Sequence, residues 1–137
     1  MEAVLQSLYS GLPILIIHFI TTILIFSFAA SVYMRITPNH EIDLINEGNI
    51  AAAISIGGAI LGLAIPMAFC LASSINVYDI VIWGLVILFI QIITYYILDF
   101  VLKGISQKIK KGEVAPVLLV AFIKISIGMM TAAAISG

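Results

Sequence analysis

Four apolar runs dominate this sequence, and each is long enough to cross a lipid bilayer. They cover about residues 12–34, 49–73, 77–102 and 114–136. A helix rises 1.5 Å per residue, so about 20 residues span the hydrocarbon core. The 137-residue chain is 63% hydrophobic and only 9% charged, which excludes an ordinary soluble domain. We therefore predict an all-α membrane protein with four transmembrane helices in a single transmembrane domain, residues 1–137.

The charged residues predict how these helices are oriented. Two polar loops, residues 35–48 and 103–113, separate the runs in pairs, and Tyr33 is expected to mark the interface beside the first loop. The basic residues in or beside the loops are Arg35, Lys103, Lys108, Lys110 and Lys111. The opposite side has Glu2 and Asp79 and no basic side chain. Because basic residues favour the cytoplasmic side, we predict cytoplasmic loops and both termini outside.

The first loop also contains residues that are typical of the start and end of a short helix, which we expect at the membrane surface. Thr37 can cap a helix that starts at Pro38, because threonine accepts hydrogen bonds from unpaired backbone N–H groups and proline is favoured at the first helical position. Gly48 would end this helix.

The end of the first loop is echoed further along the chain. Residues 45–51 read INEGNIA and residues 109–115 read IKKGEVA, which is an offset of 64 residues (112 − 48). This offset pairs the first apolar run with the third and the second with the fourth. Since a hairpin of two spans returns the chain to the side where it began, we predict two parallel rather than inverted repeats.

Three segments around the first loop resemble one bacterial membrane-protein family. They are ITPNHE at residues 36–41, NEGNIAAA at residues 46–53 and GGAILG at residues 57–62. In this order they resemble the YjfL-like family, domain of unknown function 350, and the resemblance covers essentially the whole chain. It implies a multi-pass protein of the bacterial inner membrane. It implies no established activity, substrate or cofactor, so it assigns no functional residue.

Lys124 is the most informative polar residue, because it lies about 15 Å from the start of its run, near the bilayer centre. A charged lysine there costs about 2.5–3.5 kcal/mol on insertion scales and usually faces protein or water. Gln91 falls at a similar depth, Thr21 and Thr22 lie slightly deeper, and His18 lies in the outer third. We predict that these residues form an intramembrane polar site.

Other interpretations of these residues stay open. Lys124 could snorkel, or could stay neutral and hydrogen-bonded to hold the helices in register. His18 could be a packed, hydrogen-bonded residue or a member of a proton relay. No carboxylate is expected at the depth of Lys124, so a pathway along it would favour anions.

Small residues mark the second run as a packing helix. Gly57, Gly58 and Gly62 precede Pro66 in this run. Gly58-x-x-x-Gly62 is typical of helices that approach closely in membranes, within one chain or between copies, and Pro66 is expected to bend the helix. The backbone exposed at these positions could instead line a cavity.

The sequence contains no signature of an enzyme, such as His-Glu-x-x-His, Gly-x-Ser-x-Gly or a phosphate-binding glycine loop. We expect no enzymatic activity, no metal or cofactor and no nucleic-acid partner. Two functional classes remain. The first is an oligomeric membrane subunit or scaffold that presents its cytoplasmic loops to a protein partner or to anionic lipid through the basic cluster of Lys103, Lys108, Lys110 and Lys111. The second is a component of a small-solute or ion conduit, favouring anions, that uses Lys124 and Gln91.

Overall fold

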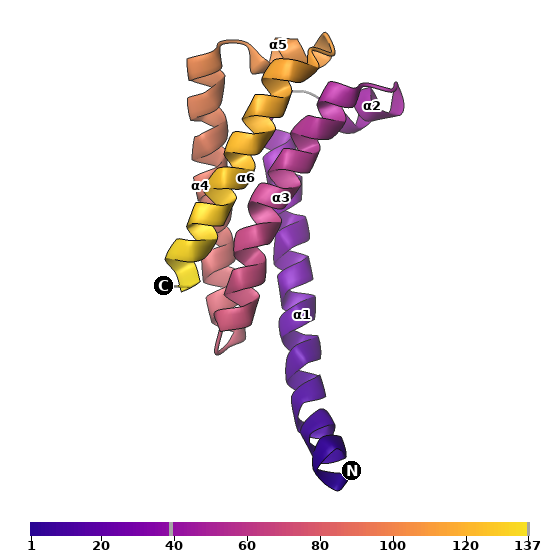
Figure 1. The fold of residues 1–137 in the computed structure, drawn as a ribbon, viewed down its shortest axis with the longest axis vertical. Coiled ribbons are helices and arrows are strands. Elements are labelled where there is room, and N and C mark those ends of the chain that lie inside the picture. Colours follow the sequence, from indigo (N-terminus) through magenta and orange to yellow (C-terminus); the bar gives the residue numbers. More distant parts are fainter. Residues whose placement is uncertain (39, 137) are drawn as a thin grey trace.

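The computed structural model describes residues 1–38 and 40–136, and in this part of the chain it contains six α-helices and no strand (Figure 1). Asn39, which belongs to the family motif, and Gly137 lie outside the described residues. The helices are α1 (Glu2–Ile36), α2 (Glu41–Asn46), α3 (Ile50–Ser73), α4 (Val77–Leu102), α5 (Ile105–Lys110) and α6 (Val114–Ser136). The helices α1, α3, α4 and α6 are long and apolar enough to cross a membrane. The prediction of an all-α protein with four membrane-spanning helices is confirmed.

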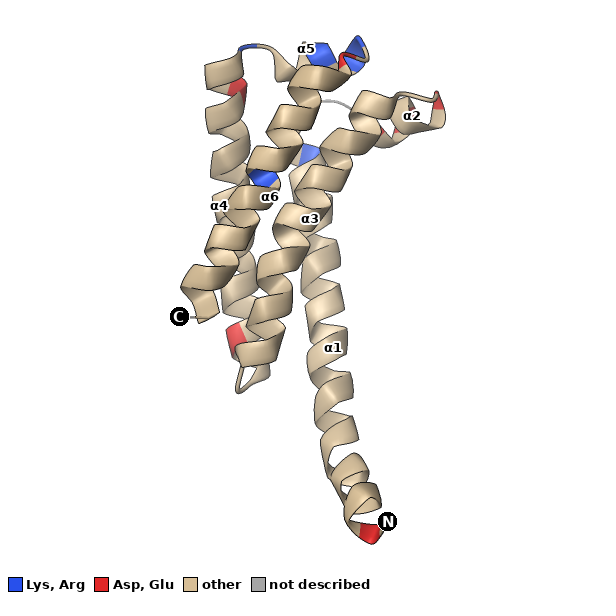
Figure 2. Ribbon diagram, viewed as in Figure 1, with Lys and Arg blue, Asp and Glu red and all other residues tan. Residues whose placement is uncertain are grey.

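The two short helices, α2 and α5, lie at the same end of the bundle, which we call the loop end (Figure 1). The turn between α3 and α4 lies at the opposite end, and most Lys and Arg residues gather at the loop end (Figure 2). Asn49 joins the two loops. Its side chain accepts a hydrogen bond from the Ala52 N–H at 3.0 Å, which caps α3, and its Nδ2 donates to the Ile109 carbonyl of α5 at 2.8 Å.

The short helix expected in the first loop is present, but it begins at Glu41 rather than at Pro38. Thr37 ends α1 instead of capping α2, so this prediction was wrong. The Thr37 N–H bonds to the Tyr33 carbonyl at 3.2 Å, and the Thr37 hydroxyl donates to the Met34 carbonyl at 2.9 Å. A threonine hydroxyl can donate as well as accept, and a residue before proline avoids helical geometry, so Thr37 suits a helix end better than a helix start.

Helix α1 is longer than its apolar run and is shifted along the bundle. It begins at Glu2, continues through Pro13, and projects beyond the α3–α4 turn with its N-terminal part (Figure 1). Its other end is sunk into the bundle, because Tyr33 is 3% exposed and packs in one core cluster with Ala59 and Leu63. Ala59 lies about 14 Å from the start of α3. The expectation that Tyr33 marks the membrane interface was therefore wrong.

Helices α3 and α6 both begin at the loop end and form the closest contact in the bundle. A Cβ atom added to Gly58 would lie 2.7 Å from the Ala121 Cα, and one added to Gly128 would lie 2.7 Å from the Gly62 carbonyl oxygen. Side chains larger than hydrogen at these positions would push the two backbones apart. A Cβ on Gly57 would meet no heavy atom within 4 Å, so Gly57 faces away from this contact.

Pro66 is buried inside the bundle. Helix α4 also packs closely through a glycine, in this case against a side chain of α1. Gly84 of α4 faces Ile25 of α1, where an added Cβ would overlap the Ile25 side chain. The glycines therefore set the helix spacing at several levels, and this spacing positions the buried polar residues described next.

Candidate functional site

Lys124 lies in the middle of α6 and is buried inside the bundle, with 2% of its surface exposed. Its Nζ lies 5.2 Å from the centre of the Tyr33 ring of α1 and 5.7 Å from the centre of the Tyr95 ring of α4. Aromatic faces attract a cation at such distances, more strongly where water is excluded. Since side chains lean towards the N-terminus of their own helix, the Lys124 side chain is directed towards the loop end.

Glu41, the first residue of α2, supplies a buried carboxylate near Lys124. It is 6% exposed, and its Oε1 accepts a hydrogen bond from the Ser55 hydroxyl of α3 at 3.1 Å. Burial raises the pKa of Glu41, while the charge of Lys124 and the hydrogen bond from Ser55 lower it. The prediction that no carboxylate lies at the depth of Lys124 was wrong. We call Glu41, Ser55, Lys124, Tyr33 and Tyr95 the buried charge site.

Gln91 contacts Lys124 through the backbone and not through the ammonium group. Its Nε2 donates to the carbonyl of Gly62 at 3.0 Å and to the carbonyl of Lys124 at 3.3 Å. One side chain of α4 thereby holds α3 and α6 together. The other amide atom, Gln91 Oε1, is buried and has no hydrogen-bond partner among the described residues.

The structure does not bring His18, Thr21 and Thr22 to Lys124. The hydroxyl of Thr21 donates to the Ile17 carbonyl and that of Thr22 to the His18 carbonyl, both at 2.8 Å, so each bonds its own helix. Thr22 precedes Tyr33 by 11 residues (33 − 22), which is about 16 Å along α1. These three residues lie nearer the opposite end of the bundle.

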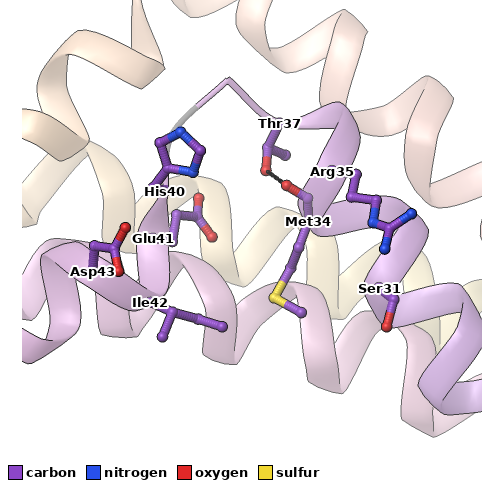
Figure 3. A pocket seen from close by; sticks show the side chains of 8 residues that line it. All are labelled: Ser31, Met34, Arg35, Thr37, His40, Glu41, Ile42 and Asp43. Carbon is purple, nitrogen blue, oxygen red and sulfur yellow. Dashed lines mark hydrogen bonds between the residues drawn. The ribbon is translucent and has the colours of Figure 1, made fainter.

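Glu41 lines both a small, partly open cavity and a larger open pocket. Glu41 and Tyr33 line the cavity, which has a volume of about 40 Å³, and the buried Tyr33 hydroxyl has no hydrogen-bond partner among the described residues. The open pocket, of about 550 Å³, lies at the loop end, and Glu41, Arg35 and Asp43 contribute to its wall (Figure 3). We call it the interfacial pocket. Glu41 can therefore meet water in the interfacial pocket while it also interacts with the other residues of the buried charge site.

The lysines of the predicted basic cluster lie outside this site, at the loop end. Lys103, Lys110 and Lys111 are exposed and Lys108 is half-buried. Lys110 and Lys111 line a shallow groove between the two loops, together with Glu47 and Asn49. Among the described residues, no group of three or more His, Cys, Asp or Glu side chains is placed to hold a metal ion.

Comparison with known proteins places the chain in a family. The model of the family described as Domain of Unknown Function (DUF350) matches residues 7–135. The chain belongs to this family. It is also similar to the "UPF0719 inner membrane protein YjfL" of Escherichia coli strain K12 and of Escherichia coli O157:H7. In both comparisons it is 27% identical over 114 residues, covering 83% of this chain and 84% of the relative. No solved structure matches it.

These findings confirm the resemblance seen around the first loop of this DUF350 protein. Together with the four membrane-spanning helices, they identify a multi-pass protein of the inner membrane. The buried charge site was missed by the sequence prediction except for Lys124. The signal that could have found Glu41 is its position three residues after Pro38, because the Thr37-Pro38 pair ends α1 and the chain then folds back onto the bundle.

Proposed function

We propose that this inner-membrane protein moves protons across the membrane through the buried charge site. The observation that carries the proposal is a buried lysine, Lys124, whose charge acts on a buried carboxylate, Glu41, that also lines an open pocket. Ionisable residues inside membranes are costly, and they commonly mark proton or ion pathways.

The size of the small cavity beside Glu41 favours a proton over a larger transported species. A volume of about 40 Å³ exceeds the roughly 10–15 Å³ that one water requires, but it leaves little room for a solute. The carboxylate of Glu41 also works against an anion beside Lys124. The proton proposal therefore replaces the anion-favouring conduit expected from Lys124 and Gln91, since Gln91 bonds backbone carbonyls.

The transfer can be written with the two ionisable groups and one bridging water. The Glu41 carboxylate takes a proton from water in the interfacial pocket and becomes a neutral carboxylic acid. Once Lys124 has released its own proton towards the opposite end, its neutral amine takes a proton from the bridging water as that water takes the proton of Glu41. The O–H bond of Glu41 breaks and an N–H bond forms on Lys124, which leaves a carboxylate and an ammonium. Release towards the opposite end requires α3, α4 and α6 to move apart near Gln91, because the Gln91 bonds close that route.

The test is proton flux into liposomes that contain the purified protein. A potassium diffusion potential drives protons inward, and a trapped pH-sensitive dye records them. The wild type is expected to acidify the lumen, while Lys124→Met and Glu41→Gln reduce the rate to that of empty liposomes. Lys110→Met, the same chemical change on an exposed loop residue, is expected to keep the wild-type rate. Absence of flux in correctly inserted wild type, or full flux in Lys124→Met, would contradict the proposal.

The joined loops favour a second function, that of a membrane subunit that presents the loop end to a partner. The bond from Asn49 to Ile109 makes one surface of the two loops, with Lys108, Lys110 and Lys111 on it. For this second function the loop end must face the cytoplasm, as the basic residues predict. Assembly into a homo-oligomer is a separate prediction. Replacing the three lysines by Glu is expected to remove a chemical cross-link between the loops and a neighbour in native membranes. Unchanged cross-links would contradict this second function.

A further inference from the structure

The interfacial pocket carries opposite charges on its two sides. Figure 3 shows Arg35 at one side and Asp43 at the other, with Met34 and Glu41 between them. Arg35 belongs to the last turn of α1 and Asp43 to α2, and both side chains are exposed. Such a pocket suits a ligand that has both an anionic and a cationic group. Glu41 of the proposed proton pathway also lines this pocket, and the ligand contacts described below use Arg35 and Asp43 instead.

A shallow, mostly apolar depression on the surface of α1 continues from this pocket, and we call it the α1 groove; all the residues that line it belong to α1. It has a volume of about 250 Å³, is walled by Phe28 and Val32, and shares Ser31 and Arg35 with the pocket. Because α1 is a membrane-spanning helix, the groove runs along it from the pocket, which opens where α1 ends and α2 begins, towards the hydrocarbon region. A ligand that fills both has a charged head and an apolar chain.

We propose that the interfacial pocket binds the headgroup of an aminophospholipid, with an acyl chain of that lipid along the α1 groove. The planar guanidinium of Arg35 donates hydrogen bonds to the phosphate oxygens, a geometry in which arginine binds bidentately. The primary ammonium of an ethanolamine headgroup donates to the carboxylate of Asp43.

Other common headgroups match the pocket less well. The quaternary ammonium of choline has no N–H to donate to Asp43. A glycerol headgroup has no positive charge, so its phosphate would face the carboxylate of Asp43 with only Arg35 to balance it. Asp43 is therefore the residue that selects the headgroup, while Arg35 holds the phosphate that all these lipids share.

The test measures which lipids stay bound to the full-length protein. Protein is purified from vesicles with equal amounts of phosphatidylethanolamine, phosphatidylcholine and phosphatidylglycerol of identical acyl chains, and bound lipid is identified by native mass spectrometry. The wild type is expected to retain phosphatidylethanolamine about fivefold over the other two, the effect of one exposed charged contact. Asp43→Asn is expected to bring phosphatidylethanolamine down to the phosphatidylcholine level, and Arg35→Gln to lower the retention of all three.

Both substitutions change exposed side chains, so the variants are expected to fold, which a thermal unfolding midpoint equal to that of the wild type checks. Lys110→Gln changes a loop lysine outside the pocket and is expected to keep the wild-type preference. Three results would overturn the proposal: preferential retention of phosphatidylglycerol, equal retention of all three lipids by the wild type, or an unchanged preference in Asp43→Asn.

Discussion

The first half of the molecule, α1–α3, and the second half, α4–α6, have the same local frame at the loop end. The bounds of α2 and α5 differ by 64 residues, and so do the starts of α3 and α6. The Gly48 N–H bonds to the Ile45 carbonyl at 2.9 Å, and the Gly112 N–H bonds to the Ile109 carbonyl at 3.0 Å. Both glycines have positive φ angles, +89° and +75°, which side chains rarely adopt. The origin of the two halves as a repeat stays a prediction.

The halves differ where the buried charge site is built. Glu41 begins α2 as a buried carboxylate, while the residue 64 positions later, Ile105, begins α5 as a buried apolar side chain. At a second pair of positions the charged residue lies in the second half: Ile60 of α3 is 40% exposed, while Lys124, 64 positions later in α6, is 2% exposed. Because α5 begins with the buried Ile105, the local structure at the loop end does not require a charged residue at this position. The difference supports a functional role for Glu41 and Lys124.

The largest expected change in stability comes from replacing Glu41 and Lys124, one after the other, by the residues at the matching positions of the other half. Glu41→Ile, which copies Ile105, leaves Lys124 without its carboxylate and is expected to lower the free energy of unfolding by about 3 kcal/mol. Adding Lys124→Ile, which copies Ile60, removes the unpaired cation as well and is expected to recover most of the loss. Reversible unfolding in detergent measures both. A loss of stability in the double variant equal to the sum of the losses in Glu41→Ile alone and Lys124→Ile alone would show that the two charges do not act on each other.

A smaller effect is expected from a matched pair of glycines in α3. In Gly58→Ala the new methyl group lies against the Ala121 backbone of α6, so the helices must separate, at a cost of about 1–3 kcal/mol. In Gly57→Ala the methyl group meets open space and is expected to cost nothing. Unfolding midpoints of the two variants provide the measurement. Equal midpoints would mean that the close contact between α3 and α6 does not limit stability.

The smallest effect is expected where the two halves are joined. Asn49→Ala removes both the cap of α3 and the bond to the Ile109 carbonyl, and is expected to cost about 1–2 kcal/mol. Glu113, 64 positions later, has an exposed side chain, so Glu113→Ala is expected to change stability by less than about 0.5 kcal/mol. Hydrogen exchange of the loop-end amides compares the two variants. Faster exchange in Glu113→Ala than in Asn49→Ala would contradict this account of the loop contact.

The sequence was sufficient to predict the four long helices, because hydropathy over 20 residues decides whether a segment crosses a bilayer. It also identified Lys124, since a charge inside an apolar run is conspicuous. Counting residues from the loops did not reveal the partners of Lys124. Such counting assumes that every helix ends at the same level, whereas α1 is sunk into the bundle and carries Tyr33 down to Ala59.

Glu41 was missed for a related reason. The segment after Thr37 folds back, so a residue of the polar loop reaches the hydroxyl of Ser55 inside the bundle. Counting also ignored the lean of a lysine side chain towards the start of its own helix, which brings the amine of Lys124 closer to the loop end than its Cα. Tyr95, near the end of the third apolar run, is buried by the packing of α4 against the bundle and faces Lys124, which its position in the sequence does not reveal.

The most direct test of the buried charge site is an infrared titration of the Glu41 carboxyl group in lipid. Its protonated C=O band is assigned by its loss in Glu41→Gln. Burial raises the pKa of Glu41, so the midpoint of the wild type is expected above the usual range of glutamate. Lys124→Met removes a charge that lowers this pKa, so its midpoint is expected to be higher still. A midpoint in the usual range that Lys124→Met does not move would contradict the account.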